Sequence, residues 1–334
     1  MSSNRFVSTT ARLAAMAGVL AVVAAPKDVK KPKLGVQTPG IQIPFASLKS
    51  EAEIKLEASP TGVAFTTEAL IAAGALVQRI DVKTNKPGDK ITGLDNACGG
   101  LLNALSSLWT VNCGTKTLAK LDAKTAKITA TIDVAAVVAP FALAASADSV
   151  WLLADDKTTL LRIDPKENAP VAGIRLPAAC SSILFAESSL WVTCPGADKV
   201  LRIDPRTNLV DKRIDVPGQP VAVAFGEASI WVLARKEGKV AQIDPKTNKV
   251  ASTIELGIPN ATGSMAFGDG SVWISAPGFP ITRINPVTAK VVQQFAGDGA
   301  GLIYSGLGSV WLANPLTKTV TRFDPKRIAA TLAE

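Results

Sequence analysis

The sequence contains no histidine and a single tyrosine, and aromatic residues make up 5% of its 334 residues. The absence of histidine excludes Ser-His-Asp and Cys-His catalysis, histidine-ligated zinc and proton transfer through imidazole. The scarcity of aromatic residues leaves no ladder on which nucleic-acid bases would stack. With 47% hydrophobic residues, 19% charged residues and a net charge of +8, the chain is typical neither of a disordered protein nor of a strongly basic nucleic-acid-binding tail.

Apolar runs long enough to cross a membrane are also missing. The apolar run at residues 13–25 has 13 residues, whereas a membrane span needs about 20. The run follows Arg5 and Arg12 and ends in small residues, which is typical of a secretory signal cleaved after Ala24. An uncleaved N-terminal anchor is the alternative. We therefore expect a signal segment at residues 1–25 and a periplasmic or secreted monomer without a transmembrane segment in the mature chain.

Two further regions follow the predicted signal. Residues 26–50 predict an extended linker, because their lysines and prolines cannot bury much surface; the residues are Lys27, Lys30, Lys31, Lys33, Pro26, Pro32, Pro39 and Pro44. Residues 51–334 are long enough for one large domain with its own core.

The large region repeats with a period near forty residues. A tryptophan is followed by an aspartate thirteen residues later in five copies, and Trp273 by Asn285 twelve residues later. A first copy lacks the tryptophan but keeps Asp81. The Asp/Asn positions are 81, 122, 164, 204, 244, 285 and 324, with spacings of 39 to 42 residues. Such a period is typical of a propeller or a solenoid.

Each copy contains the signals of four strands. Residues 219–257 show short apolar or alternating segments separated by Gly, Pro and Asn turns, at 220–225, 230–234, 239–244 and 249–254. Seven four-stranded units favour a ring, which leaves only short protected sheet edges. The prediction is an all-β fold: a seven-bladed β-propeller of four-stranded antiparallel blades. Either residues 52–57 or residues 327–332 would supply the strand that closes the last blade.

The repeated Asp and Trp have structural explanations. An aspartate before proline starts a turn, because its carboxylate accepts a hydrogen bond from the backbone two residues later. The sequence shows this pair at Asp164, Asp204, Asp244 and Asp324. Each tryptophan stands within an apolar strand and is expected to pack between neighbouring sheets.

The repeat resembles a known family over residues 51–330. Residues 189–193 (SLWVT) followed by residues 200–208 (VLRIDPRTN) are similar to the YVTN-type propeller repeat and to the repeat of streptogramin (virginiamycin B) lyases. The resemblance implies the propeller fold. For a lyase it also implies a catalytic His ten residues before the Trp, a Glu three or four residues after it, and a Mg²⁺ ion.

The residues at those positions do not support lyase chemistry. The His positions hold Thr61, Gly99, Phe141, Ser181, Val221, Gly263 and Gly301. The Glu positions hold Asn112/Cys113, Ala154/Asp155, Cys194/Pro195, Ala234/Arg235, Ala276/Pro277 and Asn314/Pro315. Only Asp155 is acidic, and its blade offers Phe141 at the His position. None of the residues at the His positions can act as a base near neutral pH.

The four cysteines predict two disulfides. Cys98 and Cys113 are 15 residues apart, and Cys180 and Cys194 are 14 apart. Each pair joins the start of a first strand to the end of a second strand, which one hairpin brings together. Bridges also fit an exported protein. A four-cysteine metal site is the alternative, but these spacings do not resemble those of zinc sites.

The loops around the predicted channel supply candidate binding residues: Asn112, Asp155, Asp156, Arg235, Lys236 and Asn314. Asp155 and Asp156 could hold a hard cation, although an ordinary polar loop is the interpretation we favour. We expect a non-catalytic module that binds a protein or small molecule there without a cofactor. The alternative is a Mg²⁺-dependent lyase or hydrolase related to streptogramin lyases.

A basic residue follows the turn Asp in most copies: Lys83, Lys124, Lys166, Arg206, Lys246 and Lys326. These turns would form a ring of cations on the face opposite the cysteines. Such a ring would bind anionic lipid or nucleic acid, or it would only keep the surface solvated, which is the interpretation we favour.

Overall fold

The computed structural model describes residues 33–331, apart from 74–75, 126, 135–141 and 155–156. The predicted signal segment and its cleavage site therefore lie outside the described residues. The chain divides into residues 1–33 and 34–334, and the following account concerns the second unit. Within the described part of the chain, no helix is long and apolar enough to cross a membrane.

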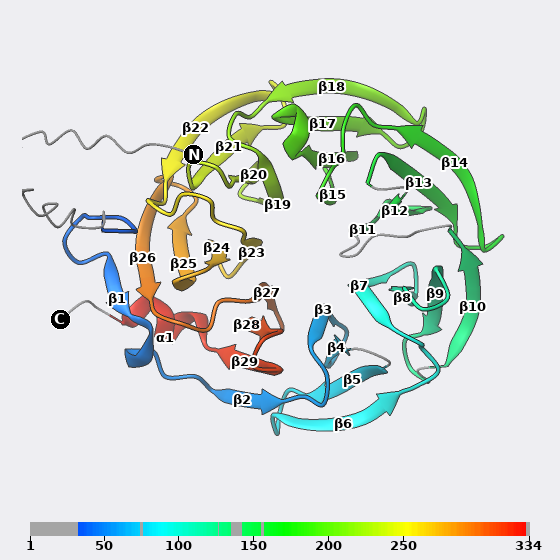
Figure 1. The fold of residues 1–334 in the computed structure, drawn as a ribbon, viewed down its shortest axis with the longest axis horizontal. Coiled ribbons are helices and arrows are strands. Elements are labelled where there is room, and N and C mark those ends of the chain that lie inside the picture. The colour runs from blue at the N-terminus through cyan, green and yellow to red at the C-terminus, as the bar shows by residue number, and fades with distance from the viewer. Residues whose placement is uncertain (1–32, 74–75, 126, 135–141, 155–156, 332–334) are drawn as a thin grey trace, which may run out of the picture. The chain divides into compact units, whose positions relative to one another are not determined.

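Seven antiparallel sheets surround a common centre and confirm the predicted all-β propeller (Figure 1). Blades 1 to 3 are formed, from inner to outer strand, by β3 (Pro60–Phe65), β4 (Ala69–Ala73), β5 (Leu76–Asp81) and β6 (Lys86–Ile91); by β7 (Ala97–Ala104), β8 (Ser107–Asn112), β9 (Thr117–Asp122) and β10 (Ile128–Asp133); and by β11 (Leu143–Ala145), β12 (Val150–Ala154), β13 (Thr159–Asp164) and β14 (Ala169–Arg175).

The same order of strands continues in blades 4 to 7. They are formed by β15 (Ser182–Ala186), β16 (Ser189–Cys194), β17 (Lys199–Asp204) and β18 (Leu209–Asp215); by β19 (Pro220–Gly226), β20 (Ser229–Ala234), β21 (Lys239–Asp244) and β22 (Lys249–Glu255); by β23 (Ser264–Gly268), β24 (Ser271–Ala276), β25 (Phe279–Asn285) and β26 (Lys290–Ala296); and by β27 (Leu302–Gly306), β28 (Ser309–Asn314) and β29 (Thr319–Phe323), completed by β2 (Ala52–Lys55). The short 3-10 helix η2 (Pro195–Ala197) follows β16.

An N-terminal strand closes the ring. β2 pairs antiparallel with β29, with Ile54 opposite Val320, and Ile54 is buried against the core of blades 7 and 1. The competing C-terminal segment forms the helix α1 (Pro325–Ala330) instead. Asp324 caps this helix by accepting a hydrogen bond from the Lys326 amide. The alternative that the sequence left open is therefore decided in favour of the N-terminal strand.

Part of the predicted linker packs against the propeller. Strand β1 (Gln42–Pro44) joins the sheet of blade 6 in parallel with β26, and the 3-10 helix η1 (Phe45–Ser47) follows it. Ile43 and Leu48 are buried in the same cluster as Trp273 and Phe323. The described part of this segment is thus held on the blades, because Ile43 and Leu48 supply apolar surface among its prolines and lysines.

In blades 2 to 7 the second strand is the most buried, and its tryptophan lies at the centre of the core. All six tryptophans are fully buried. Five indole Nε1–H groups donate to the carbonyl oxygen five residues earlier, and that of Trp151 donates to the Ser146 hydroxyl. The bond satisfies the polar atom of a side chain that otherwise contributes apolar area.

The chain leaves the third strand with the same hydrogen bond in every blade, in the turn to the fourth strand in blades 1 to 6 and at the start of α1 in blade 7. The Asp or Asn side chain accepts from the amide two residues later, at Asp81, Asp122, Asp164, Asp204, Asp244, Asn285 and Asp324. This is the turn geometry expected from the sequence. The repeated Asp, and the Asn that replaces it in blade 6, therefore have a structural explanation in all seven copies.

A cation on the third strand joins most blades to the next one. Arg202 lies with its guanidinium 5.2 Å from the centroid of the Trp191 ring. It donates to the Pro245 carbonyl oxygen at 2.7 Å and to Asn248 Oδ1 at 2.9 Å, both in the turn of blade 5. Lys120, Arg162 and Arg322 make equivalent bonds to the next blade, and Arg79 bonds to carbonyl oxygens there. We call these five side chains the interblade cations.

The two junctions on either side of blade 6 are different. Blade 5 has Gln242 at the cation position, and its amide bonds to Ser229 and Ser252 within its own blade. In blade 6, the cation Arg283 bonds to Ser271 and Gln293, also within its own blade. These junctions are covered instead by additional elements, β1 on the outer edge of blade 6 and α1 against Gln293.

Candidate functional site

The loops that follow the second and fourth strands lie at one end of the ring, which we call the channel face. A pocket of about 350 Å³ opens there between the inner strands of blades 5, 6 and 7. It is lined by Val221, Thr262, Gly263, Ser264, Ser275, Ala276, Pro277, Ala300, Gly301, Leu302 and Pro315. Each of the three blades contributes the start of its inner strand, the end of its second strand, or both. The pocket therefore exists only because these blades pack side by side.

The lining of this pocket carries no ionisable side chain. Its two serine hydroxyl groups are occupied in joining blades 6 and 7. The Ser275 hydroxyl accepts from the Gly301 amide at 3.0 Å, and the Ser264 hydroxyl donates to the Gly301 carbonyl oxygen at 3.2 Å. The remaining surface is formed by apolar side chains, glycine and Thr262, so the pocket suits an uncharged, largely apolar group.

The pocket coincides with positions where a streptogramin lyase would hold its catalytic pair. Val221, Gly263 and Gly301 stand at the His position of blades 5 to 7, and Ala276/Pro277 stand at the Glu position of blade 6. These residues neither transfer protons nor offer the carboxylate oxygens that Mg²⁺ prefers. They therefore do not fit the magnesium ion that the resemblance implies. Among the described residues, no group of three or more Cys, Asp or Glu side chains could hold a metal ion.

The single tyrosine does not supply a catalytic base. Tyr304 lies on β27, the inner strand of blade 7, and packs against the cluster around Trp311. Burial raises the pKa of Tyr304 to about 12, so its hydroxyl stays protonated near neutral pH.

Asn112 and Asn314, two of the predicted binding residues, are used in local structure. Each is buried at the end of the second strand of its blade. Asn112 Oδ1 accepts from the Asn96 amide at 2.8 Å. Asn314 Oδ1 accepts from the amides of Leu316 and Thr317. These bonds hold the channel-face loops in shape and leave little of either amide for a ligand.

Arg235 and Lys236 lie beside the loop that lines the pocket. The Arg235 carbonyl oxygen accepts from the Ala261 amide and that of Lys236 accepts from the Asn260 amide, both at 3.1 Å. The Arg235 side chain bonds to Gln219 Oε1 at 2.8 Å, and the Lys236 side chain is exposed. The structure therefore brings these two residues to the pocket's edge. Asp155 and Asp156 lie outside the described residues.

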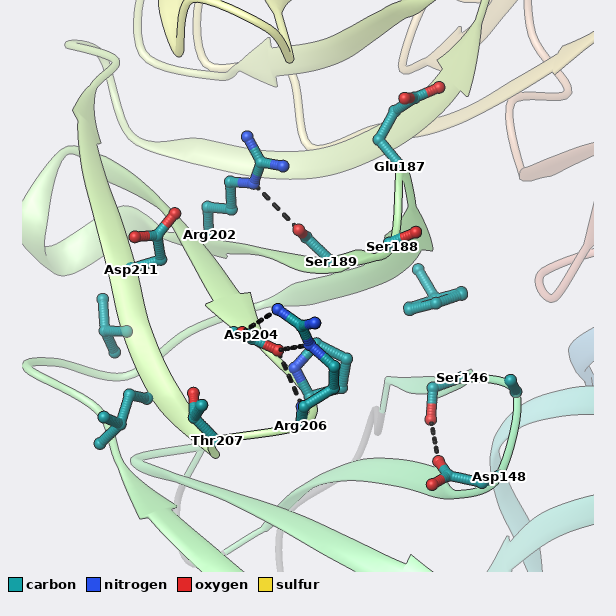
Figure 2. A pocket seen from close by; sticks show the side chains of 15 residues that line it. Ser146, Asp148, Glu187, Ser188, Ser189, Arg202, Asp204, Arg206, Thr207 and Asp211 are labelled. Carbon is teal, nitrogen blue, oxygen red and sulfur yellow. Dashed lines mark hydrogen bonds and ion pairs between the residues drawn. The ribbon is translucent and has the colours of Figure 1, made fainter.

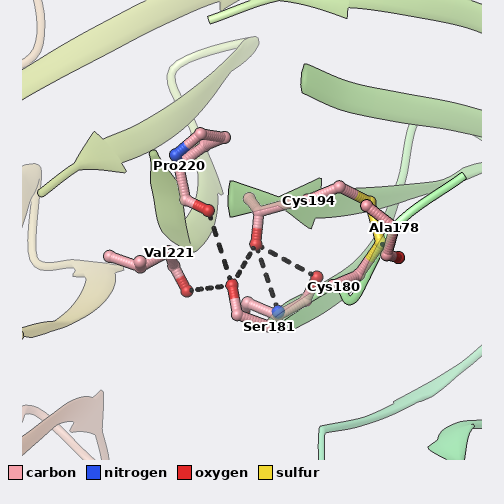
Figure 3. Close-up of a disulfide and its surroundings, with 8 residues drawn as sticks. Ala178, Cys180, Ser181, Cys194, Pro220 and Val221 are labelled. Atoms are coloured by element: carbon pink, nitrogen blue, oxygen red, sulfur yellow. Dashed lines mark hydrogen bonds between the residues drawn. A yellow bond between two sulfur atoms is a disulfide. The ribbon is translucent and has the colours of Figure 1, made fainter. Parts of the chain in front are cut away.

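The cysteines pair as the sequence predicts. Cys98 is bonded to Cys113 with the Cα atoms 5.7 Å apart, and Cys180 is bonded to Cys194. Next to the second disulfide, the Ser181 hydroxyl donates to the Val221 carbonyl oxygen of blade 5 at 2.9 Å (Figure 3). The disulfide thus anchors a channel-face loop that contacts one wall of the pocket.

The opposite face carries the turns with the predicted ring of cations. All six cations are exposed, but each lies two residues after a turn carboxylate, so their field is largely neutralised. In blade 4 a side-chain hydrogen bond from Arg206 and backbone hydrogen bonds lower the pKa of Asp204. Blade 6 breaks the pattern, because Val287 takes the place of a cation and is 82% exposed. This arrangement weakens the interpretation of the ring as a binding site for anions.

A larger groove of about 810 Å³ lies on that opposite face between blades 3 and 4 (Figure 2). Figure 2 shows Arg202 bonded to Ser189, and Asp204 bonded to Arg206 within one turn. These charged groups are thus used in joining or shaping the blades, and the groove follows the space between two neighbouring blades.

Comparison with known proteins identifies the fold and leaves the family open. No protein-family model matches the chain, and no curated protein matches its sequence. The crystal structure of selenomethionine-substituted virginiamycin B lyase from Staphylococcus aureus is similar, with a TM-score of 0.68 at 14% sequence identity. The similarity covers 81% of this chain and 97% of the lyase chain. At this identity the comparison shows a shared β-propeller fold.

The sequence did not identify the channel pocket as a site, because its lining residues are individually unremarkable. The signal was nevertheless present in the repeat. Val221, Gly263 and Gly301 stand at equivalent positions of three consecutive copies. The packing of blades 5, 6 and 7 side by side therefore brings three uncharged residues together.

Proposed function

We propose that the protein is a non-catalytic binding module that holds a compact, uncharged, largely apolar ligand in the channel-face pocket. The observation that supports this most is the lining itself, which has apolar side chains and glycine where a lyase of this fold would have an acid and a base. Arg235 and Lys236 at the edge would contact a polar part of the ligand or a protein that carries it. Asp155 and Asp156, which lie outside the described residues, stay candidates from the sequence alone.

We further propose that the protein acts outside the cytoplasm, in the periplasm or after secretion, as a monomer. The two disulfides support this location, because such bonds form and persist in oxidising compartments. The N-terminal segment predicted to be a secretory signal is consistent with the same location.

The test of the binding function is a stabilisation screen of the mature domain with uncharged compounds, run with and without divalent metal. Compounds that raise the melting temperature are then measured against Val221→Asp, which places a charge in the pocket. We expect affinity to fall at least tenfold, because an unpaired charge in an apolar pocket is costly to desolvate. Val287→Asp is the matched control, since it makes the same change at an exposed position on the opposite face. Equal affinity in both variants would overturn the proposal.

Alanine variants test the rim separately. Arg235→Ala and Lys236→Ala should weaken capture of a partner in pull-down experiments while changing the melting temperature little, since Lys236 is exposed and Arg235 half-buried. Unchanged capture by both variants would show that a partner does not use this part of the rim.

A metal-dependent lyase or hydrolase is the second candidate, supported by the fold shared with virginiamycin B lyase over 97% of that chain. It predicts Mg²⁺-dependent turnover of a cyclic ester such as virginiamycin B by the purified protein. Turnover that is abolished by a chelator would favour this candidate over simple binding.

A further inference from the structure

The loop at residues 256–263, which connects blade 5 to blade 6, is contacted at both ends. Its inner end, Thr262 and Gly263, lines the channel pocket. At its outer end, Gly257 bonds to Gly35 of the N-terminal segment 34–44, and Leu256 bonds to Gln294 of blade 6. Ile258 and Ala261 between them are buried in the core of blades 5 and 6, so the loop is a packed connection between the two contacts.

The contact at the outer end is a direct one between backbones. The Gly35 amide donates to the Gly257 carbonyl oxygen at 2.8 Å. Gly257 has a φ of +68°, and a Cβ atom there would lie 2.4 Å from the Gly35 carbonyl oxygen. Only glycine permits this approach, so the position of the segment and that of the loop depend on each other.

Gln294 joins the N-terminal segment, blade 6 and the loop in one group of hydrogen bonds. Its side chain is fully buried. Oε1 accepts from the Val36 amide at 2.8 Å, and Nε2 donates to the Leu256 carbonyl oxygen at 3.1 Å. Gln42 holds the segment from the other side through bonds to the carbonyl oxygens of Leu34 and Val36. A buried amide with these partners is costly to displace.

The pocket lies where the ring is held together differently from elsewhere. Blades 5, 6 and 7 line it, and the interblade cations bond across the other five junctions. At the junction of blades 5 and 6, Gln242 bonds within its own blade. The bonds of segment 34–44 therefore contribute directly to the position of loop 256–263 between blades 5 and 6.

We propose that docking of segment 34–44 and occupancy of the channel pocket are coupled. The docked segment holds loop 256–263 in the geometry that forms the pocket, and a ligand in the pocket favours the docked segment by the same free energy. A partner or modification that displaces the segment would thus lower affinity at the other end of the loop. This inference rests on the proposed binding function for its ligand, whereas its structural half concerns the free protein.

The first experiment uses the free protein. Gln294→Ala removes the bonds to Val36 and Leu256, and hydrogen exchange is measured at the amides of Asn260 and Ala261. We expect faster exchange there by at least fivefold. Gln293→Ala is the matched control. This neighbouring side chain on the same strand donates instead to the carbonyl oxygens of Ile328 in α1 and of Thr331 just after it. Gln42→Ala gives the same test with a milder change if Gln294→Ala does not fold. If the exchange rates at these two amides equal those of the Gln293→Ala control, the coupling is overturned.

The second experiment measures the affinity for N-phenyl-1-naphthylamine, an uncharged apolar fluorophore. We expect the affinity to fall about fivefold or more in Gln294→Ala and Gln42→Ala, and to stay unchanged in Gln293→Ala. A fivefold change is the lower end of typical coupling between two sites. Equal affinity in all variants, with binding that remains sensitive to Val221→Asp, would refute the coupling and leave the binding function standing. Absence of fluorophore binding in the unmodified protein would count against the proposed function, while the exchange measurement still decides the structural half.

Discussion

At the scale of single residues, the repeated aspartates show how one side chain serves the same purpose in many blades. Backbone hydrogen bonds, first from Lys246, lower the pKa of Asp244 below its ordinary value of 3.8. Asp81, Asp122 and Asp164 are shifted in the same direction by amides of their own turns. Each folded-state pKa is thus lower than the unfolded one. The resulting stability is present above the unfolded pKa and is lost as the pH falls through the folded value.

Asp244→Asn tests this linkage. Asparagine keeps the turn, as Asn285 does in blade 6 by accepting from the Val287 amide, but it does not titrate. We expect a slightly lower melting temperature at pH 7, because the stability from the ionised carboxylate is missing, and a smaller further loss than in the unmodified protein between about pH 4 and pH 2. The measurement is the melting temperature across this range. Asp89→Asn, at an exposed strand position, controls for the change in net charge.

Asn248 tests the interblade cations. Its Oδ1 accepts from Arg202 across the junction of blades 4 and 5 at 2.9 Å. Asn248→Ala should lower the free energy of unfolding by about 1–3 kcal/mol, the range for a hydrogen bond to a charged group. Chemical denaturation measures the loss, and a double-mutant cycle with Arg202→Gln isolates the pair. A loss equal to that of the exposed neighbour Thr247→Ala would contradict the assignment.

At the scale of elements, the junction of blades 5 and 6 can be converted into the type found elsewhere. Gln242 and Ala289 stand where other blades have the cation and its asparagine, and Ala289 already has a positive φ of 50°. The free energy of unfolding of the double variant Gln242→Arg/Ala289→Asn should rise by about 1 kcal/mol. Each single variant should raise it by less. Chemical denaturation of all three variants checks the non-additivity.

Each disulfide fixes one hairpin of one blade. Replacing both Cys180 and Cys194 by alanine should lower stability by about 3 kcal/mol in the chain-entropy model. Because Ser181 next to this disulfide bonds to Val221, the same variant should also weaken binding in the channel pocket. The double alanine variant of Cys98 and Cys113 is the control, since blade 2 does not line that pocket. The two variants are compared by denaturation and by fluorophore affinity.

Elements were predicted from the sequence more accurately than the contacts between them. The strands expected in residues 219–257 agree with β19 to β22 to within one residue at each end, because alternation and turn residues act locally. The closing strand was left open because residues 52–57 and 327–332 both have a strand-like pattern. Asp324 before Pro325 starts a helix in the second case, which a turn signal alone does not distinguish.

The interblade cations were missed although the repeat contains them, two residues before the turn Asp in blades 1 to 4 and 7. On a strand, an isolated arginine is typical of a solvated surface. Pairing of the second and third strands brings its guanidinium onto a tryptophan of the same blade, and only the ring brings it into the next turn. The channel pocket was missed for the same reason. Its shape depends on where three blades meet, while its residues carry no chemistry that a motif search detects.

At the scale of the whole molecule, stability depends on the contact between distant parts of the chain. Ile54→Ala removes buried side-chain atoms from the strand that completes blade 7. We expect a loss of about 2–4 kcal/mol, as for large-to-small changes in a packed core. Lys55→Ala, at the exposed neighbouring position, should change the free energy of unfolding by less than about 0.5 kcal/mol. Denaturation midpoints of the two variants provide the comparison.

The joining of the two ends in blade 7 has a consequence for biosynthesis. The Ser309 hydroxyl bonds to Glu51, and 258 residues separate the two. A newly made chain therefore carries β2 without its partner until the last blade leaves the ribosome or the export channel. During that interval β2 from one molecule can complete blade 7 of another, which is the geometry of a domain-swapped dimer. Refolding at high protein concentration should accordingly yield exchanged dimers that dilute refolding avoids.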